Sequence, residues 1–529
     1  MVAPAAVGGR RLLLPLGIAL LGLVVNIIVA MSMAPTTDEG SHVAYGAAIL
    51  RGNPNRSVSY LDSKMPVSAL NAFPRGVGAF LRDHRIASGR AAADILLDLR
   101  TPRWATVAAA FGLCLLVFLY AESLFGRTAG LFAQLLFVME PNITAHSTVA
   151  TTDLYSAAAV VLSLYCLRRF LLAPSTANAA HTALALALAQ LTKFTAAYLY
   201  IVLAVVLLAS LGLEQRCRVA WRQMAVLLAL TVAGFLATIN AGFLFDRTFT
   251  PLSQYKFRSE TFRALQQVPG LRAVPLPLPY PYLQGFDWMS YHNSTGLNFD
   301  NIVLLNEVRG RELSRSDGFP SYYLITYALK VPIGMQVLLI LGLVWIFRNR
   351  RTAGLLLANE GLLLITAGVF LAMLSLFSKT QIGIRHILPV LAIGAILSGA
   401  AFAEWARFSA RRKLFLAGCL LYVVVSVSSY FPHMIPYFNE LIPDRKLAYR
   451  YLADSNLDWG QNDWLVERFL KSNPDVILDP EQRVAGRILV SANLLAGVSP
   501  PKADYFLRLE GLQPIAHVGY AHLLFVAPP

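Results

Sequence analysis

The sequence predicts an all-α polytopic membrane protein, and three observations lead to this fold class. The chain has 529 residues, of which 56% are hydrophobic and only 14% are charged, and its mean hydropathy of +0.55 lies outside the range usual for soluble domains. Apolar runs recur along the chain, and several reach the roughly 20 residues that a helix needs to cross a bilayer. Basic residues gather in short clusters between these runs, as in the cytoplasmic loops of membrane proteins.

The net charge of +15 does not indicate a nucleic-acid partner, because the basic residues are dispersed among these short loops. The cysteines fall in or beside apolar runs and not in the long polar segments, so neither a disulfide framework nor a thiolate metal site is expected. They are Cys114, Cys166, Cys217 and Cys419.

The first apolar run, residues 12–33, follows Arg10 and Arg11 and resembles a signal peptide with residues 32–34 as the cleavage triplet. Two features argue against cleavage. The run is long enough to cross the bilayer, which the apolar part of a signal peptide usually is not, and Pro35 would follow the cut unfavourably. We therefore expect a retained first helix.

The later apolar runs predict ten further helices, giving about 11 transmembrane helices in all. Two of the runs, 129–139 and 179–191, are short, and each might merge with its successor. Merging either would move an arginine cluster to the outer side, so charge favours two hairpins. The ten runs are 104–120, 129–139, 154–167, 179–191, 194–212, 224–245, 325–347, 355–377, 387–403 and 414–431.

The charge pattern puts the N-terminus in the cytoplasm, and an odd number of crossings puts residues 432–529 outside. We expect a transmembrane domain over 1–431, with two outer loops, 35–103 and 246–324. Helical spacing in the first loop predicts short juxtamembrane helices, and prolines in the second predict irregular backbone. The C-terminal region, with a helix and two β-like runs, reads as a small α/β appendage.

Ionisable residues gather at the expected outer ends of the helices. Such residues are costly at membrane depth and tend to be functional. A carboxylate can accept a proton from an attacking hydroxyl, and lysine and arginine can hold a phosphate as its charge grows. The residues concerned are Asp38, Glu39, His146, Asp153, Lys193 and Arg385.

Each of these residues also has a structural interpretation. Asp38 and Glu39 can be solvated acids at a helix end, and Asp153 can cap the helix that starts at Leu154. Lys193 and Arg385 can extend to lipid headgroups. His146 can be a hydrogen-bonded structural residue, as buried histidines often are.

Residues 454–463 carry Asp454, Asn456 and Asp458 at the 1, 3, 5 spacing of a calcium loop. Trp459 stands where such a loop needs glycine, and Leu465 stands where it needs a bidentate glutamate. We therefore predict no metal site there and expect an Asx-type turn before a helix.

Six short segments, taken in order, resemble the GT-C glycosyltransferases of the protein O-mannosyltransferase and lipid A aminoarabinose transferase type, which depend on a phospholipid carrier. Singly each segment is a weak signal, but six in the right order are specific, and the resemblance runs from about residue 10 to 460. The segments are TTDEGSHVAYG, SKMPVSALNAFP, PNITAHSTVATTD, LAQLTKFTA, YALKVP and IGIRHILPVLA.

The resemblance implies transfer of a sugar from a polyprenyl-phosphate or polyprenyl-diphosphate carrier to an acceptor on the outer side of the membrane, with inversion at the anomeric carbon. Asp38 matches the acidic residue that acts on the acceptor as base or orienter. Glu39 completes the pair, and Asp153 matches a second acidic position.

The resemblance also implies the groups that hold the carrier phosphate. Lys64 falls where the family has a basic residue, although Met65 and Val67 replace the family's proline and leucine and so alter the local backbone. The implied phosphate-binding residues are Lys64, Lys193 and Arg385, with His146 as a lesser candidate.

We therefore expect a multi-pass glycosyltransferase of the bacterial inner membrane with a periplasmic active site. Its partners would be the lipid-linked donor, a protein, lipid or polysaccharide acceptor, and membrane lipids. The sequence leaves open whether a divalent cation takes part. Two alternatives stay open: a lipid or solute transporter, which usually shows internal repeats, and an inactive carrier-lipid binding scaffold.

Overall fold

All eleven predicted apolar runs contain helices in the computed structural model, which describes residues 12–55, 63–84, 89–211, 219–297, 300–349, 353–482, 484–499, 509 and 511–528. Cys217 lies outside the described residues. The helices are α1 (Leu13–Ser32), α5 (Arg103–Phe125), α6 (Arg127–Met139), α8 (Asp153–Leu172), α9 (Thr176–Ala189), α10 (Tyr198–Leu211), α11 (Trp221–Gly242), α14 (Tyr322–Lys330), α15 (Ile333–Arg348), α16 (Ala353–Ala358), α17 (Glu360–Leu376), α18 (Leu388–Ser398) and α19 (Ala410–Ser428).

Not all of these helices are long enough to cross a membrane by themselves. Within the described residues, five segments are long and apolar enough: α1, α5, α8, α11 and Ile384–Arg407. A sixth is α14 with α15, which meet at a bend of 112°. The chain is thus a multi-pass membrane protein, but the count of eleven crossings is not confirmed.

The bend between α14 and α15 has a local cause. Val331 is extended, with φ −93° and ψ 134°, and Pro332 follows it at the N-cap of α15. A residue before proline is pushed out of the helical region, and proline itself offers no N–H to continue a helix. The predicted single run 325–347 is therefore two helices.

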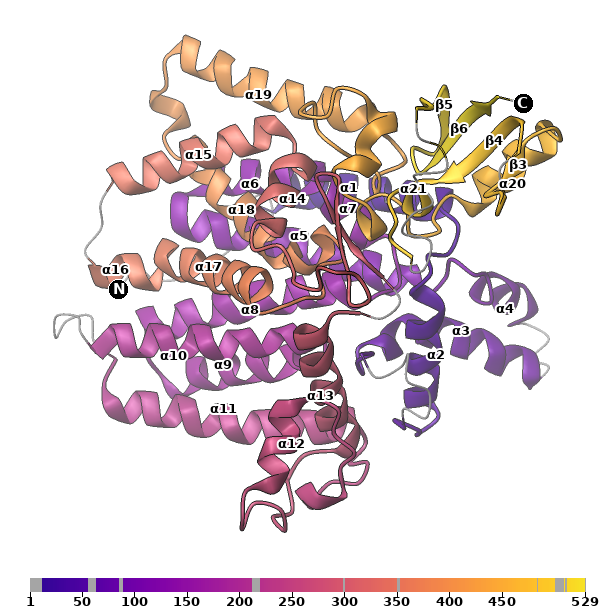
Figure 1. The fold of residues 1–529 in the computed structure, drawn as a ribbon. Helices are drawn as coiled ribbons and strands as arrows, with labels where there is room; N and C mark the ends of the chain where they lie inside the picture. Colours follow the sequence, from indigo (N-terminus) through magenta and orange to yellow (C-terminus); the bar gives the residue numbers. More distant parts are fainter. Residues whose placement is uncertain are drawn as a thin grey trace.

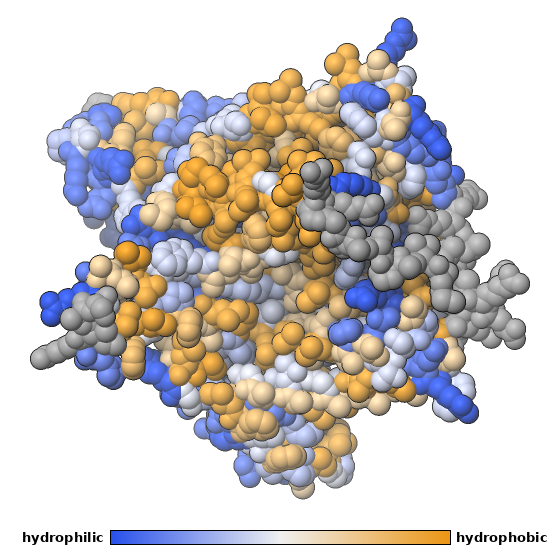
Figure 2. Space-filling view, turned by 180° about the vertical axis from the view of Figure 1, so that it is seen from behind, coloured by the Kyte–Doolittle hydropathy of each residue, from blue (hydrophilic) through white to orange (hydrophobic). Residues whose placement is uncertain are grey.

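The helical body buries one segment and exposes others. The stretch Ile384–Arg407 is 89% buried, whereas α1 and α11 bury only about a quarter of their residues and turn leucine and valine side chains outward. Figure 2 shows broad apolar patches over this body, with hydrophilic patches toward the edges. Lipid is the solvent that such a surface requires.

Short helices follow α1, as predicted for the loop 35–103. They are α2 (Glu39–Leu50), α3 (Ser68–Asp83) and α4 (Arg90–Leu96). The loop 246–324 has no regular element over 268–279, which fits the expected irregular backbone, but it also forms α12 (Glu260–Gln267), α13 (Tyr280–Thr295) and a hairpin of β1 (Ile302–Leu304) and β2 (Glu307–Arg309), which the sequence did not predict.

The C-terminal region carries a four-stranded sheet of order β3-β4-β6-β5 with α20 (Asp463–Ser472) packed on it. The strands are β3 (Ile477–Leu478), β4 (Gly486–Ser491), β5 (Ala516–Val518) and β6 (His522–Ala527), and α21 (Ala492–Leu495) follows β4. Only the β3–β4 pair is parallel. α20, β5 and β6 lie where the sequence predicts a helix and two strands, whereas β3 and β4 were not predicted.

The sheet and α2–α4 lie together at one end of the helical body, on the right in Figure 1. We call this the sheet end. Between β5 and β6, Gly519 adopts a positive φ of 57°, and a Cβ there would lie 2.5 Å from the Asn462 side chain. The chain segment before α20 and the sheet are therefore in close contact.

Candidate active site

A cavity of about 1440 Å³ opens at the sheet end. Its walls come from parts of the chain that lie far apart in sequence: the α1–α2 junction, the start of α8, α13, the segment before α18, residues 454–463 and the sheet. Four of the predicted site residues line it together with Asp38. They are Lys64, Asp153, Lys193 and Arg385.

Asp38 is paired with Arg385 across the cavity. Asp38 is the N-cap of α2, and its Oδ2 accepts a hydrogen bond of 2.7 Å from Arg385 Nη1. Although burial raises the pKa of a carboxyl, the charges of Arg385, Lys64 and His42 hold the pKa of Asp38 below its usual range. Asp38 is therefore an ionised acceptor and not a solvated acid at a helix end.

Arg385 is fixed from several sides. Its guanidinium lies 4.3 Å from the centre of the Trp459 ring, and its Nε has no hydrogen-bond partner in the described part of the chain. The backbone beside it is held by residues 455 and 456: Asn456 Oδ1 accepts from the Ile384 N–H at 3.0 Å, and Ser455 Oγ donates to the Ile382 carbonyl. Arg385 is thus a cation that the surrounding residues hold in position.

Asp153 and Lys193 form a second ion pair in the same cavity. Lys193 Nζ lies 2.5 Å from Asp153 Oδ1, and Thr151 Oγ1 donates to Asp153 Oδ2 at 3.1 Å. Thr152, not Asp153, is the N-cap of α8, and no side chain caps that helix end. The capping interpretation of Asp153 is therefore wrong, and Lys193 faces a carboxylate inside the protein.

Glu39 points away from the cavity although it is next to Asp38. It is only 5% exposed, and Arg103 reaches its two oxygens at 2.8 Å each. The same carboxylate accepts from the backbone N–H of Thr36 and of Ala150, both at 2.7 Å. Arg103 also donates to three carbonyls at the end of α1, so Glu39 ties α1, α5 and the segment before α8 together.

His146 also lies outside the cavity lining. It is 2% exposed, in the short helix α7 (Pro141–Ser147), with its ring against that of Trp459 at 5.7 Å between centroids. Burial lowers the pKa of His146 to about 3, so its ring is neutral near pH 7. A neutral ring has no positive charge with which to attract a phosphate.

Several cavity residues were missed by sequence reasoning. His42 lines the cavity one helical turn after Asp38, and its Nδ1 lies 3.2 Å from Ser68 Oγ. The spacing of four residues on a helix was a signal for it. Trp459, Asp300 and Asp454 carried no such signal, because only the tertiary structure brings residues 300 and 454–459 to the α1–α2 junction.

Several residues of the segment 454–463 line the cavity. Asp458 Oδ1 accepts from the Gly460 N–H at 3.2 Å, which is the predicted Asx-type turn. Within the described residues no three His, Cys, Asp or Glu side chains group as ligands for a metal ion. Buried Lys330 donates to the carbonyl of Asn456 at 2.6 Å, so this segment is anchored to the end of α14.

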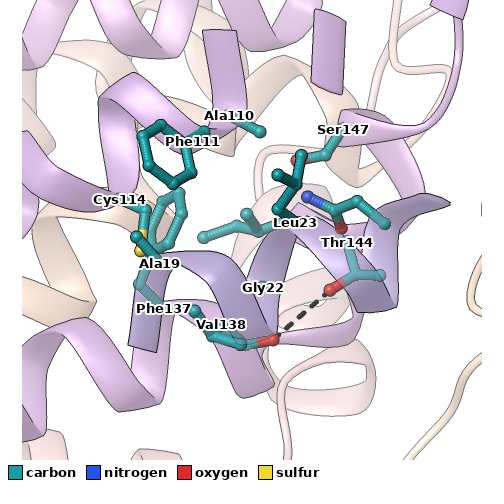
Figure 3. Close-up of a pocket in the computed structure, with 12 residues that line it drawn as sticks. Ala19, Gly22, Leu23, Ala110, Phe111, Cys114, Phe137, Val138, Thr144 and Ser147 are labelled. Carbon is teal, nitrogen blue, oxygen red and sulfur yellow. Dashed lines mark hydrogen bonds between the residues drawn. The ribbon is translucent and has the colours of Figure 1, made fainter. Parts of the chain in front are cut away.

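A second hollow lies between α1, α5, α6 and α7, lined by small and apolar side chains such as Gly22, Phe111 and Val138 (Figure 3). Its volume is about 10 Å³, room for about one water molecule. It is too small to be a substrate site.

Buried ion pairs line a large cavity at the end of an apolar helical body, and ionisable residues at such a depth in a membrane protein tend to mark a functional site. Residues 99–236, about a quarter of the chain, match a family model described as dolichyl-phosphate-mannose-protein mannosyltransferase. This segment of the chain therefore resembles a glycosyltransferase family.

Solved structures resemble this chain at low sequence identity, and one of them reaches the TM-score expected of a shared fold. The apo oligosaccharyltransferase of Archaeoglobus fulgidus is 12% identical, with a TM-score of 0.50 over 78% of this chain and 55% of that one. ArnT of Cupriavidus metallidurans, in a crystal structure with undecaprenyl phosphate, is 14% identical, with a TM-score of 0.46 over 99% of this chain and 100% of that one. A comparison with curated proteins found no match.

Proposed function

We propose that this protein is a glycosyltransferase of the GT-C superfamily, and that it moves a sugar from a polyprenyl-phosphate carrier to an acceptor at the periplasmic face of the bacterial inner membrane, with inversion. The observation that carries the proposal is the pairing of Asp38 with Arg385 beside Lys64 in one cavity at a membrane-embedded helix end. The matching family model, whose description names a lipid-phosphate-linked mannose, supports this donor class.

Lys64, Arg385 and Lys193 are the proposed phosphate-binding residues. Lys64 is 7% exposed and interacts electrostatically with Arg385 and Lys193 as well as with the two aspartates. Burial lowers the pKa of Lys64, and a bound phosphate would stabilise its charged form. As the sugar leaves, its phosphate gains negative charge, and cations in a partly dry site stabilise that charge strongly.

Asp38 is the proposed acceptor-orienting residue. The acceptor oxygen attacks the anomeric carbon, the bond from that carbon to the phosphate oxygen breaks, and the polyprenyl phosphate leaves with the electron pair. The acceptor proton passes to Asp38. Attack from the side opposite the phosphate inverts the anomeric carbon.

Donor binding and Asp38 are coupled through Arg385. The guanidinium that now pairs with Asp38 would also bind the donor phosphate, and this competition weakens its hold on the carboxylate. The pKa of Asp38 then rises toward its usual range, which makes it a better proton acceptor once the donor is in place.

The experiment is complementation of a deletion strain. We expect a lipid-linked sugar to accumulate without the protein, as measured by mass spectrometry, and to disappear when the wild-type protein is restored. Asp38→Asn should fail to clear it, whereas Asp475→Asn, at an exposed position outside the cavity, should clear it fully. No accumulation would refute the proposed function, and clearance by Asp38→Asn would remove Asp38 from the chemistry.

Donor binding is measured separately on purified protein with undecaprenyl phosphate as the probe. Lys64→Ala and Arg385→Ala should each weaken binding, and the barrier to transfer should rise by roughly 2–4 kcal/mol, as for removed oxyanion donors. Asp38→Asn should bind the probe at least as tightly as wild type. Unchanged binding in both cation variants would contradict the phosphate site.

A further inference from the structure

The loop that follows α11 exposes large apolar side chains outside the helices that are long enough to cross a membrane. It covers residues 244–276 and contains α12. Seven of its large apolar side chains are at least 40% exposed, and two phenylalanines reach 63%. They are Leu244, Phe245, Phe249, Leu265, Val268, Leu271 and Val274. Apolar side chains exposed together on a surface mark a contact with a protein or with lipid.

Hydrogen bonds fold the 244–276 loop into two paired limbs. The Phe249 N–H donates to the Leu276 carbonyl at 2.8 Å, and the Ser253 N–H donates to the Arg272 carbonyl at 3.0 Å. Residues 249–253 therefore lie beside 272–276, and the apolar side chains of both limbs belong to one ordered surface.

The loop is held at the level of the last turn of α11. The side chain of Asn240, two residues before the end of α11, donates to the Pro277 carbonyl at 3.0 Å and accepts from the Thr248 hydroxyl at 2.6 Å. Only 22% of α11 is buried, and the helix is apolar enough to cross a membrane. In Figure 1 the loop lies at the bottom, beside α11 and outside the helical body.

This position puts the start of the loop among lipid headgroups. Phe245 follows Gly242, the last residue of α11, by three residues, so the two are at most about 11 Å apart. The polar layer on each side of a bilayer is about 5–8 Å thick. The exposed phenylalanines therefore lie near the boundary between lipid and water.

Basic residues alternate with the apolar ones in the loop. Five basic residues stand against two acidic ones, and no ion pair in the described part of the chain involves Lys256 or Arg272. Phenylalanine and leucine next to lysine and arginine are typical of segments that bind a membrane surface, and the cations favour anionic headgroups. The basic residues are Arg247, Lys256, Arg258, Arg263 and Arg272.

The backbone after α11 gives a second, independent observation. Four residues have positive φ: Leu244 at 54°, Phe245 at 56°, Arg247 at 49° and Phe249 at 67°. Left-handed backbone is unfavourable for a residue with a side chain, whereas glycine adopts it freely. Three large apolar side chains thus occupy positions that both the backbone and contact with water disfavour, and contact with lipid would offset the second cost.

We propose that the 244–276 loop is a membrane anchor. It inserts its apolar side chains among the lipids on the side of the membrane where the cavity lies, and its lysine and arginine side chains bind anionic headgroups. Arg263 of α12 and Trp288 of α13 line the cavity, so the anchor holds this wall of the cavity at the membrane surface. The inference does not depend on the proposed sugar transfer.

The test is photo-crosslinking of the purified full-length protein in nanodiscs of equal amounts of phosphatidylglycerol and phosphatidylcholine. The photoreactive residue p-benzoylphenylalanine replaces Phe245 or, in a second sample, Leu271 on the other limb. Mass spectrometry then identifies the adducts. We expect lipid adducts at both positions, with phosphatidylglycerol in about fivefold excess, which is the effect of about one lysine or arginine at a membrane surface.

Two control positions are exposed and apolar like Phe245. Ile340, 60% exposed in the middle of α15, should give lipid adducts with the two lipids in about equal amounts. Val526, 53% exposed on β6 of the C-terminal sheet, should give no lipid adduct. Lys256→Gln combined with Arg272→Gln should keep the adducts at Phe245 but reduce the excess of phosphatidylglycerol at least by half.

The absence of lipid adducts at Phe245 and Leu271, when Ile340 gives them, would overturn the anchor. Cross-links between two copies of the chain in place of lipid adducts would overturn it too, because the surface would then be a protein interface. Equal amounts of the two lipids at Phe245, or an excess that survives in the double variant, would overturn the binding of anionic headgroups by these cations. No sugar donor enters the experiment, so its failure leaves the proposed function intact.

Discussion

Asp38 and Glu39 are neighbours in sequence with opposite surroundings. Asp38 lines the cavity and meets Arg385, whereas Glu39 is enclosed by Arg103 and two backbone N–H groups. The predicted catalytic pair is therefore proposed to be one reacting carboxylate and one positioning carboxylate.

The Glu39–Arg103 pair makes a prediction about stability. Breaking a buried ion pair from one side costs about 3–5 kcal/mol, so Glu39→Gln and Arg103→Met should each lower the melting temperature of the purified protein. The double variant should lose less than the two single losses combined, because neither charge is then left alone. Differential scanning fluorimetry in detergent measures all three, and strict additivity would contradict the coupling.

Asp454 makes a prediction about pH. Burial and the nearby Asp300 charge raise the pKa of Asp454 to about 8, far above the roughly 3.9 of an unfolded chain. The unfolded state therefore loses this proton first, and the wild type loses stability as pH rises from about 4 to 8. Asp454→Asn should match the wild-type melting temperature near pH 4 and exceed it at pH 8, since asparagine also tolerates the positive φ of 57°.

A matched control shows whether the gain in stability is specific to the buried position 454. Asp475→Asn, at an exposed ion pair with Arg487, should show no growing gain between pH 4 and 8. A melting-temperature gap for Asp454→Asn that shrinks as pH rises would show that Asp454 is stabilised as a carboxylate in the folded protein.

At the scale of elements, the segment 454–461 connects three parts of the site. Its backbone bonds to the α1–α2 junction, with the Thr37 N–H donating to the Trp459 carbonyl at 3.0 Å. Its side chains hold the segment before α18, and its Asn456 carbonyl receives Lys330. The segment therefore links the α1–α2 junction, the segment before α18 and the end of α14.

Asn456 is the residue through which the segment 454–461 positions Arg385. It is fully buried, and its side chain bonds both the Ile384 N–H and the Tyr322 hydroxyl at 3.0 Å. Asn456→Ala should weaken binding of undecaprenyl phosphate about tenfold and destabilise the fold by about 1–3 kcal/mol, because buried groups are left unsatisfied. Asn456→Asp, which keeps the acceptor oxygen, should restore binding in part. A merely structural role would lower stability without changing the affinity of the folded protein.

At the scale of the whole molecule, the cavity is closed by the C-terminal region, so both must lie on one side of the membrane. A reporter that is active only in the cytoplasm should be silent when fused after residue 529, and a periplasmic reporter should be active there. Fusions to truncations within α6 and α9 would test the two predicted hairpins. Cytoplasmic activity of the full-length fusion would contradict the periplasmic site.

The positions of the helices follow from the sequence, because a helix is formed by residues that are close together along the chain. Apolar runs predicted helices at all eleven places, and a helix was also predicted in the C-terminal region, where α20 lies. The apolar pattern predicts one helix over 325–347, but the conformational limits of proline and of the residue before it account for the bend at Pro332. The hairpin of β1 and β2 and the strands β3 and β4 were missed, because such short strands owe their existence to partners elsewhere.

The sequence by itself determined that this is a membrane protein with a group of acids and bases at helix ends, and its ordered motifs resemble those of the GT-C glycosyltransferases. Only the tertiary structure decided which acid faces the cavity, because the partner of Asp38 lies 347 residues away. It also placed Glu39 and His146 outside the cavity lining and brought Asp300 and Asp454 into it. The physical reason is that hydrophobic periodicity is local, whereas the charge that a buried carboxylate meets is set by long-range packing.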